Sequence, residues 1–438
     1  MNFIRSFSFT FGTKVVSLIL VLLSRVVLAR LLGPTGLGSF GSALNLTTVI
    51  SRWGSVGIAP ATQFMSGKYQ DSKNPILTYT VLLSLILGLG NMLVAHVFAE
   101  EIANWQFAES SSAQGIFRQL LPFLPIIILS MALPIMLLGA GRYQAYSLTQ
   151  IIPLLIQTLI LLSAFWQAAT MKTVVIAQIS YWLSTVIIGF TLTGFPNFQL
   201  GFDRGLLHTY INLSLSLWPL VVFQFGMARL PVLIGSQYLD SPRLGHYLLA
   251  LNIAEAFLIV HGSIAPIVFN QKISKLAGRE TLARTIRFSN LLLLSALIMT
   301  CLIGKPIFTM LFGYEFIPSW TLLLKLFPWV MVHGMVNIFL NYLIAAERKR
   351  LVYFIQFLSF VGLIISGTIL CSLYGSDGLC MAALCSSLTA FIFAYVVLIN
   401  SKTEKITIAA LFIPVSQDWR YLYALLSRLK TSKRATDG

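Results

Sequence analysis

Six ionisable side chains lie inside segments of the chain that are otherwise strongly apolar. Five are basic and one is acidic: Arg25, Arg30, Arg52, Arg229, Lys325 and Glu255. A charge at mid-membrane costs on the order of 2.5–3.5 kcal/mol even on the most lenient insertion scale, so these groups must face protein or water. Guanidinium groups hold phosphate through paired, planar hydrogen bonds. The excess of basic groups therefore predicts an internal site for an anionic ligand.

Several of these basic residues also have a simpler interpretation. Arg30 and Lys325 lie near the ends of their apolar runs, where a long side chain can reach the lipid headgroups. Arg229 lies between two prolines, and the carbonyl groups freed in a bent helix can satisfy it. Arg25 and Arg52 lie deeper in their apolar runs, so their side chains do not easily reach the lipid headgroups. We expect these two residues to line the site.

Glu255 and His261 are the candidates for coupling to an ion gradient. Glu255 can neutralise one of the arginines, or it can take up a proton or a cation during a transport cycle. His261, like His96 and His333, is a lone polar residue on an apolar segment. A hydrogen-bonded packing histidine is the default interpretation, and a coupling role is the alternative.

Signatures of catalysis and of metal binding are absent from the sequence. There is no Gly-x4-Gly-Lys-Ser/Thr loop, no His-Glu-x2-His and no pair of carboxylates at a useful spacing. The four cysteines lie in or beside apolar runs without metal or disulfide spacing, and we interpret them as packing residues: Cys301, Cys371, Cys380 and Cys385. We therefore predict no catalytic residue, no metal site and no cofactor.

The elements that must position these residues are membrane-spanning helices. The 438 residues are 57% hydrophobic and only 10% charged, which is too apolar for a soluble globule. The fold class is therefore an all-α polytopic membrane protein. Windows of about 20 apolar residues predict about twelve transmembrane helices. They fall near residues 11–32, 38–60, 76–98, 119–139, 148–168, 173–193, 210–236, 244–268, 288–311, 320–344, 351–374 and 378–399.

The basic residues also predict how the chain is oriented. There are 30 Lys and Arg residues against 14 Asp and Glu, and most of the basic ones fall in alternate loops and in the tail. By the positive-inside rule those loops and both termini are cytoplasmic. The net charge of +16 is thus spread over loops that face one leaflet. We expect contact with anionic membrane lipids and no nucleic-acid partner.

An internal repeat relates the two halves of the chain. Leu37–Leu46 matches Leu244–Ile253 at an offset of 207 residues, and three weaker matches lie 206 residues apart. Six helices per repeat is an even number, so both halves enter the membrane in the same sense, as in parallel-repeat transporters. The predicted organisation is an N-terminal six-helix lobe, a cytoplasmic linker, a C-terminal six-helix lobe and a basic cytoplasmic tail, at residues 1–194, 195–209, 210–400 and 401–438.

The stretch Ser24–Tyr69 resembles one family closely. It reads SRVVLARLLGPTGLGSFGSALNLTTVISRWGSVGIAPATQFMSGKY and contains a Leu-Ala-Arg-Leu-Leu-Gly-Pro-x-Gly-x-Gly-x-Phe turn and a Gly54-x-x-Gly57 motif. These features are similar to those of bacterial polysaccharide flippases, the Wzx-type O-antigen and exopolysaccharide translocases. That family belongs to the multidrug/oligosaccharidyl-lipid/polysaccharide exporter superfamily. Elsewhere the resemblance is one of architecture.

The resemblance implies a pair of six-helix lobes in the bacterial cytoplasmic (inner) membrane. Such a protein passes an undecaprenyl-pyrophosphate-linked oligosaccharide to the outer leaflet by alternating access, coupled to an ion gradient, and is not an enzyme. It also implies basic residues in the central cavity, where this chain has Arg25, Arg30 and Arg52 in its first two helices. Glycosyltransferases and the polymerase of the same pathway are the implied partners.

Two alternatives stay open at this stage. A related exporter of lipid-linked precursors, drugs or cations shares the architecture, but a cationic guest needs embedded carboxylates, and the helices hold one acid against five bases. A membrane polysaccharide polymerase or ligase needs a substantial outer loop. The outer loops here are short, and the longest runs over about residues 100–118.

Overall fold

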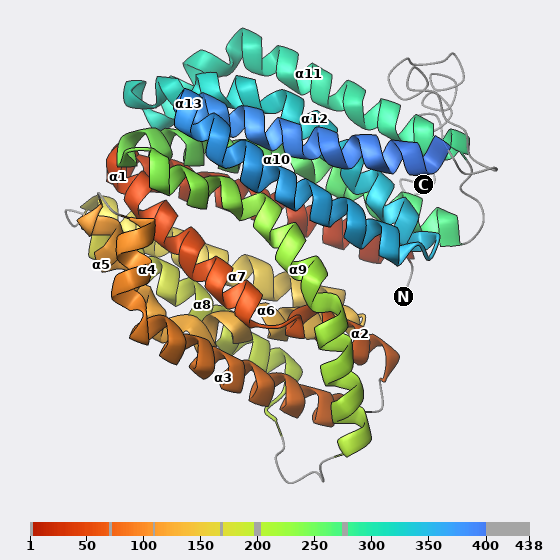
Figure 1. The fold of residues 1–438 in the computed structure, drawn as a ribbon. Helices are drawn as coiled ribbons and strands as arrows, with labels where there is room; N and C mark the ends of the chain where they lie inside the picture. The colour runs from red at the N-terminus through yellow and green to blue at the C-terminus, as the bar shows by residue number, and fades with distance from the viewer. Residues whose placement is uncertain are drawn as a thin grey trace, which may run out of the picture.

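The computed structural model describes residues 3–69, 72–107, 110–166, 170–196, 203–273 and 279–399. Within these ranges every regular element is a helix, which confirms the predicted fold class. The α-helices, labelled in Figure 1, are α1 (Phe3–Gly54), α2 (Ile58–Lys68), α3 (Lys73–Val97), α4 (Ala99–Gln106), α5 (Ser111–Leu120), α6 (Leu124–Gly139), α7 (Tyr143–Ser163), α8 (Met171–Thr193), α9 (Arg204–Tyr238), α10 (Ser241–Ile273), α11 (Arg279–Phe312), α12 (Ile317–Ala345) and α13 (Lys349–Ile399).

Nine of the described helical segments are long and apolar enough to cross a membrane. Two of them, 16–54 and 349–397, hold two spans each and bend at a glycine in the left-handed region, Gly33 at φ 61° and Gly375 at φ 60°. A residue with a Cβ rarely adopts that backbone, so glycine permits both bends. The predicted span 244–268 falls on α10, which is not among these nine segments. Within the described residues each of the other predicted spans also falls on a helical segment. The turn predicted in the glycine-rich stretch after Arg30 is the bend at Gly33.

The sequence repeat appears in the packing of α1 against α10. Gly38 and Gly245 occupy equivalent positions of the repeat, 207 residues apart. A Cβ on Gly38 would overlap the carbonyl oxygen of Ser241, and one on Gly245 would overlap that of Pro34. Pro34 and Ser241 are again 207 residues apart. The contact therefore repeats itself about a two-fold axis, and it brings two backbones together where no side chain fits.

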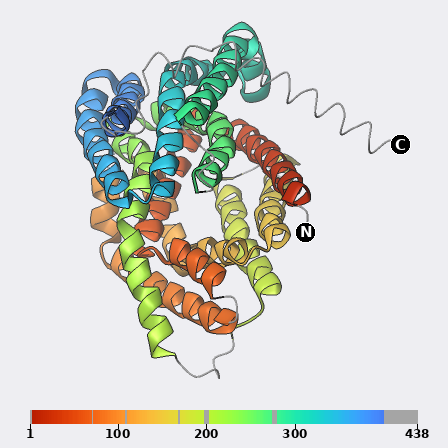
Figure 2. The same ribbon diagram turned by 90° about the vertical axis from the view of Figure 1, so that its right-hand side faces the viewer.

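The helices form two bundles, which confirms the expected pair of lobes. Figures 1 and 2 show α2–α8 in one bundle and α10–α13 in the other. The first part of α1 touches both. The hydroxyl of Ser24 lies 2.6 Å from that of Thr158 on α7, and Arg30 Nε donates to the Leu311 carbonyl of α11 at 2.8 Å. This part of α1 thus flanks the space between the lobes.

Helix α9 crosses from one lobe to the other (Figure 1). In its first half the hydroxyl of Tyr210 bonds that of Thr62 on α2. In its second half the ring of Phe223 packs on Phe360 of α13, with centroids 5.5 Å apart. Pro219 lies inside the helix between these contacts. The division of the chain at residues 209/210 stays a prediction, because the helix that follows it packs on both lobes.

The predicted linker 195–209 includes residues 197–202, which lie outside the described residues. Its last part is helical, since α9 begins at Arg204. The carboxylate of Asp203 accepts a hydrogen bond from the backbone N–H of Leu206 at 3.1 Å, which is an N-terminal cap. The helix therefore starts six residues earlier than residue 210, the start that hydropathy alone indicated.

The longest predicted outer loop folds largely as the short helices α4 and α5. Phe117 on α5 is fully buried, and Gln106 Nε2 donates to the Leu233 carbonyl and the Ser236 hydroxyl of α9, both at 2.6 Å. These contacts join the outer ends of the two lobes.

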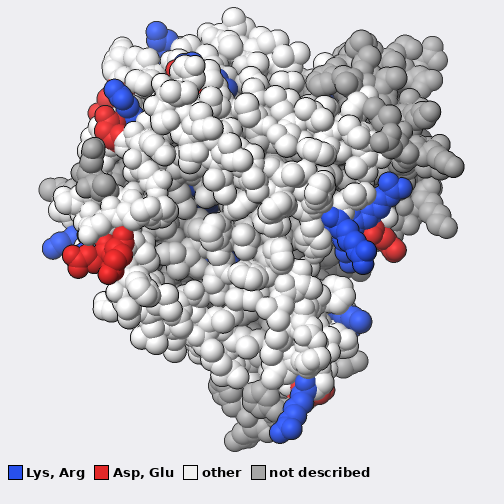
Figure 3. All heavy atoms as spheres, in the orientation of Figure 1, with Lys and Arg blue, Asp and Glu red and all other residues white. Residues whose placement is uncertain are grey.

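Charged side chains on the face shown in Figure 3 gather at the two ends of the molecule, with a broad uncharged band between them. Large apolar side chains are exposed on several helices, among them Leu93, Ile187 and Leu302. Such a band is what lipid contact requires. We name the ends by the sides that the loop charges predict, with Gly33 at the outer end and the N-terminus at the inner end.

Candidate functional site

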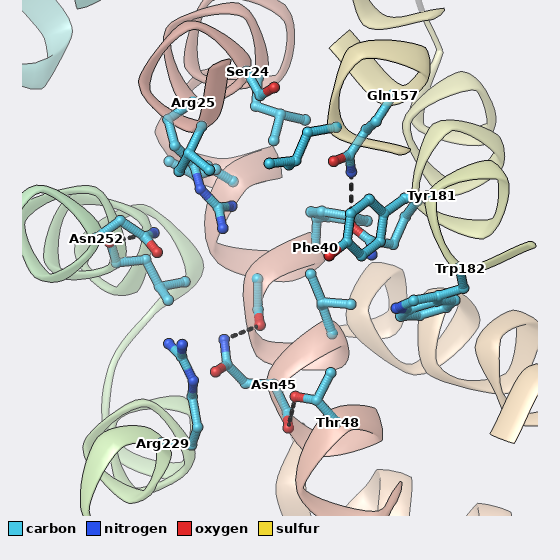
Figure 4. A pocket seen from close by; sticks show the side chains of 18 of the residues that line it. Ser24, Arg25, Phe40, Asn45, Thr48, Gln157, Tyr181, Trp182, Arg229 and Asn252 are labelled. Atoms are coloured by element: carbon cyan, nitrogen blue, oxygen red, sulfur yellow. Dashed lines mark hydrogen bonds between the residues drawn. The ribbon is translucent and has the colours of Figure 1, made fainter. Parts of the chain in front are cut away.

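A polar cavity lies between the lobes in two adjoining parts. The outer part has a volume of about 320 Å³ and the inner part about 650 Å³, and Arg25, Tyr181, Arg229 and Asn252 line both. Side chains of α1, α7, α8, α9 and α10 contribute to the walls (Figure 4). Both volumes fall in the range of ligand sites, roughly 300–1,000 Å³.

Asn45 and Asn252 line the outer part from equivalent positions of the repeat. Each donates its side-chain N–H to the carbonyl group four residues earlier, at 2.7 Å in both cases: Asn45 to Gly41 and Asn252 to Leu248. The two-fold relation seen between Gly38 and Gly245 therefore continues into the cavity.

Three of the five predicted basic residues meet in this cavity. Arg25 comes from the first part of α1, Arg52 from its second part and Arg229 from α9. In Figure 4 the guanidinium groups of Arg25 and Arg229 point into the space beside Asn252. The guanidinium carbons of Arg52 and Arg229 lie 5.4 and 5.9 Å from the ring centre of Phe225. This cation–π contact positions the two groups without cancelling their charge.

Arg52 carries an unused hydrogen-bond donor. Its Nε is buried and has no hydrogen-bond partner among the described residues. A buried N–H of a charged group without a partner costs stability, and a ligand oxygen would satisfy it. This donor fits an anionic ligand.

Glu255 pairs with Arg229 at the inner part of the cavity. Arg229 Nη1 lies 3.4 Å from Glu255 Oε1, and Nη2 donates to Oε2 at 3.4 Å. Both side chains are about a quarter exposed. The pair fits the counter-ion interpretation of Glu255 and leaves the positive charges of Arg25 and Arg52 in excess. The coupling role of Glu255 stays a prediction.

Arg30 and Lys325 do not line either part of the cavity. Arg30 donates to the carbonyl groups of Met310 and Leu311 at 2.5 and 2.8 Å, at the C-terminal end of α11, where the helix dipole favours a cation. Lys325 Nζ lies 2.7 Å from Asp377 Oδ2, beyond the bend of α13. Their binding of an anionic head group stays a prediction.

The predicted histidines are dispersed. The side chain of His261 lies outside the described residues. His333 lies 3.3 Å from the hydroxyl of Ser387, and His96 is exposed. Within the part of the chain that the structure describes, no three His, Cys, Asp or Glu side chains gather as they would at a metal site. The four cysteines carry free thiols.

Sequence reasoning missed a neutral polar wall on α7 and α8. Gln157 Nε2 donates to Gln178 Oε1 at 2.9 Å, and each of these side chains is 9% exposed. The other polar and aromatic members are Tyr146, Gln150, Tyr181 and Trp182. Tyr146, Gln150 and Gln157 follow one another at intervals of four and seven residues, which places them on one helix face. That spacing was the signal in the sequence.

The outer end of the cavity is closed by contact between the lobes. The hydroxyl of Ser39 lies 3.3 Å from those of Ser110 and Ser241, and the latter two are 3.4 Å apart. Beside them, Gly38 and Gly245 bring the backbones of α1 and α10 together. We call Pro34–Ser39 and Ser241–Gly245 the outer gate. A closed outer gate excludes an outward-facing conformation.

Solved structures share this fold. "Lipid II flippase MurJ, inward closed conformation" is 14% identical over 89% of this chain and 87% of that one, at a TM-score of 0.73. An inward-facing multidrug resistance MATE family transporter of the MOP superfamily is 13% identical over 86% of this chain and 94% of that one, at a TM-score of 0.69. An outward-facing multidrug resistance MATE family transporter of the MOP superfamily is 14% identical over 88% of this chain and 94% of that one, at a TM-score of 0.56.

At these identities the structures establish the fold. No curated protein matches the chain in sequence. A sequence model described as "Polysaccharide biosynthesis protein" matches residues 27–321, about two thirds of the chain. That match runs from within α1 to the start of α12 and includes Arg52, Arg229 and Glu255. The chain is therefore a member of the polysaccharide biosynthesis protein family, built on the fold of the MOP exporter superfamily.

Proposed function

We propose that this chain is a flippase for undecaprenyl-pyrophosphate-linked oligosaccharides. It would carry them by alternating access from the cytoplasmic to the outer leaflet of the bacterial cytoplasmic membrane, with both termini in the cytoplasm. The observation that supports this most is the cavity between the lobes, lined by three guanidinium groups and one carboxylate. The family supports a polysaccharide precursor, and the shared fold with a lipid II flippase supports a lipid-linked one.

The chemistry of the head group fits the cavity. A diphosphate carries several acceptor oxygens and at least two negative charges, and arginine binds such groups through two parallel hydrogen bonds. Arg25 and Arg229 point into the same space, and Arg52 holds an unused donor. Where water is scarce, these charge-assisted bonds strengthen. The polyprenyl tail is too long to enclose, so in this proposal it stays in lipid while the head enters the cavity.

The Arg229–Glu255 pair suggests how an ion gradient acts on the cycle. An ion shifts a conformational equilibrium only if it binds one state better than another. We propose that protonation of Glu255 releases Arg229 to the diphosphate, with His261 as the second candidate for coupling. Glu255→Gln then mimics the protonated state, and we expect its transport to lose its dependence on the proton gradient while head-group binding persists.

A cationic drug is disfavoured as cargo by the same cavity. Among the described lining residues, Glu255 is the acid, and Arg229 already neutralises it. A cation would meet the uncompensated charges of Arg25 and Arg52, and like charges at short range repel.

The test is binding of a short polyprenyl diphosphate to the purified protein in detergent. We expect Arg25→Ala and Arg52→Ala to bind it at least tenfold more weakly, because a hydrogen bond to a charged group contributes about 1.5–3 kcal/mol. The Lys variants keep the charge and should retain part of the affinity. Arg118→Ala, on the exposed face of α5, is the matched control. Absence of binding by the wild type, or unchanged binding by both Ala variants, overturns the proposal.

A further inference from the structure

The two sides of the cavity differ in chemistry. Its charged groups come from α1, α9 and α10, whereas α7 and α8 contribute only neutral ones. We call the second set the α7–α8 wall, and its members are Tyr146, Gln150, Gln157, Gln178, Tyr181 and Trp182. Figure 4 shows Gln157, Tyr181 and Trp182 across the space from Arg25 and Arg229. A ligand that fills the cavity therefore meets cations on one side and neutral groups on the other.

The α7–α8 wall has hydrogen-bonding capacity that the protein does not use. The Gln157–Gln178 bond occupies one group of each amide, and leaves the Gln157 carbonyl and the Gln178 N–H without a bond to any described residue. Beside the wall, the hydroxyl of Ser147 is buried and has no partner among the described residues, in a side chain only 1% exposed. Buried polar groups are almost always satisfied, so the Ser147 hydroxyl points to a ligand or to water, and the free groups of the two cavity-lining amides can bond to a ligand as well.

The mixture of groups indicates the class of ligand. Amides donate and accept hydrogen bonds, as sugar hydroxyls do. Aromatic faces such as those of Tyr181 and Trp182 pack against the C–H face of a sugar ring and exclude water from it. The wall holds no cation to neutralise an acidic sugar and no anion to attract an amino sugar. Its chemistry matches an uncharged, polyhydroxylated ring.

We propose that the α7–α8 wall binds the first sugar of the lipid-linked head group and selects an uncharged one. The inference rests on the proposed function, which puts the diphosphate on Arg25, Arg52 and Arg229. A sugar bonded to that diphosphate extends across the cavity and reaches the amides of Gln157 and Gln178. The arginines then recognise what all such lipids share, and the α7–α8 wall recognises what distinguishes them.

The test compares two probes on the purified protein in detergent: a polyprenyl diphosphate, and the same lipid carrying a single N-acetylglucosamine. We expect the wild type to bind the glycosylated probe about tenfold more tightly, which corresponds to one or two net hydrogen bonds. In Gln157→Leu/Gln178→Leu both partners become apolar, so no orphan amide remains. This variant should lose the tenfold preference and bind the bare probe within about twofold of wild type.

Two further variants separate loss of folding from loss of selectivity. Tyr181→Phe removes one hydroxyl group and nothing else, and should reduce the preference in part. Gln63→Leu, exposed on α2, is the matched control and should keep it. Equal affinity of the wild type for both probes overturns the inference and leaves the proposed function standing. If the wild type binds neither probe, the proposed function itself fails.

Discussion

Replacing Gly38 by alanine should force the outer gate open. A Cβ at this position overlaps the carbonyl oxygen of Ser241 and lies 3.0 Å from the backbone nitrogen of Gly245. Both neighbours are backbone atoms, so no side chain can rotate away, and the two helices must move apart. Overpacking of this kind typically costs about 1–3 kcal/mol. The cost falls only on conformations in which the gate is closed.

This cost converts into a shift of population. A difference of about 1–3 kcal/mol between two states changes their ratio by about 5- to 150-fold. Gly38→Ala should therefore move the protein away from conformations with a closed outer gate by that factor. Gly245→Ala should have a similar effect, and the double variant should be less than additive, because one separation of the helices relieves both contacts.

The assay is labelling of a cysteine in the cavity by a membrane-impermeant maleimide added to the outside of intact cells. Thr48→Cys places the thiol on the cavity wall, and the exposed native cysteines, Cys301 and Cys385, are replaced first. We expect Gly38→Ala to raise the labelling rate within the 5- to 150-fold range above. Gly90→Ala is the control, since a Cβ at Gly90 meets open space. If Gly38→Ala labels at the rate of Gly90→Ala, the gate does not depend on the glycine contact.

Three further predictions concern the gate, an ion pair and the topology. Cysteines at Ser39 and Ser241, whose hydroxyls lie 3.3 Å apart, should form a disulfide when the outer gate is closed and block transport reversibly. Transport at the normal rate by the crosslinked protein would exclude rocking of the lobes. A double-mutant cycle on Lys325 and Asp377 should give a coupling energy below about 1 kcal/mol, because both side chains are more than one third exposed. Unchanged binding of polyprenyl diphosphate by Lys325→Ala would remove that residue from the site. Reporter fusions after Gly245 and Arg279 should fall on the outer and cytoplasmic sides respectively, and an outside signal at Arg279 contradicts the predicted orientation.

The spans and the repeat could be predicted because their signals lie along the sequence. A run of about 20 apolar residues has one stable solution in a bilayer, which is a helix. The glycines and the proline of residues 33–38 indicated the turn that the structure shows at Gly33. The crossing of α9 between the lobes could not be predicted, since hydropathy indicates which residues can span a membrane and not which neighbours a helix has. Hydropathy also missed the first turns of α9, which begin at the Asp203 cap before the apolar run.

The sequence predicted only those residues of the candidate site whose charge costs free energy in an apolar segment. Arg25, Arg52 and Arg229 stand out because a charge in an apolar segment needs a reason. Gln157 and Gln178 cost far less in a helix bundle, so their presence gave little signal, although they line the same cavity. Arg30 stands out for the same reason but does not line either part of the cavity. It is charged and embedded, yet its described contacts are with the end of α11, which a sequence cannot reveal.

The two-fold relation between α1 and α10 has a consequence for how cargo sits in the protein. A receptor with true two-fold symmetry offers an elongated, polar ligand two equivalent poses, head to one side or to the other. Here the gate and the pair Asn45 and Asn252 keep the symmetry, but the positions equivalent to Arg25 and Arg52 are Val232 and Ile259. The guanidinium groups of Arg25 and Arg52 therefore have no counterpart across the axis, and the two poses differ in how many cations the phosphate meets. A duplicated fold that keeps its symmetry at the gate and loses it in the charges would bind an elongated cargo preferentially in one orientation.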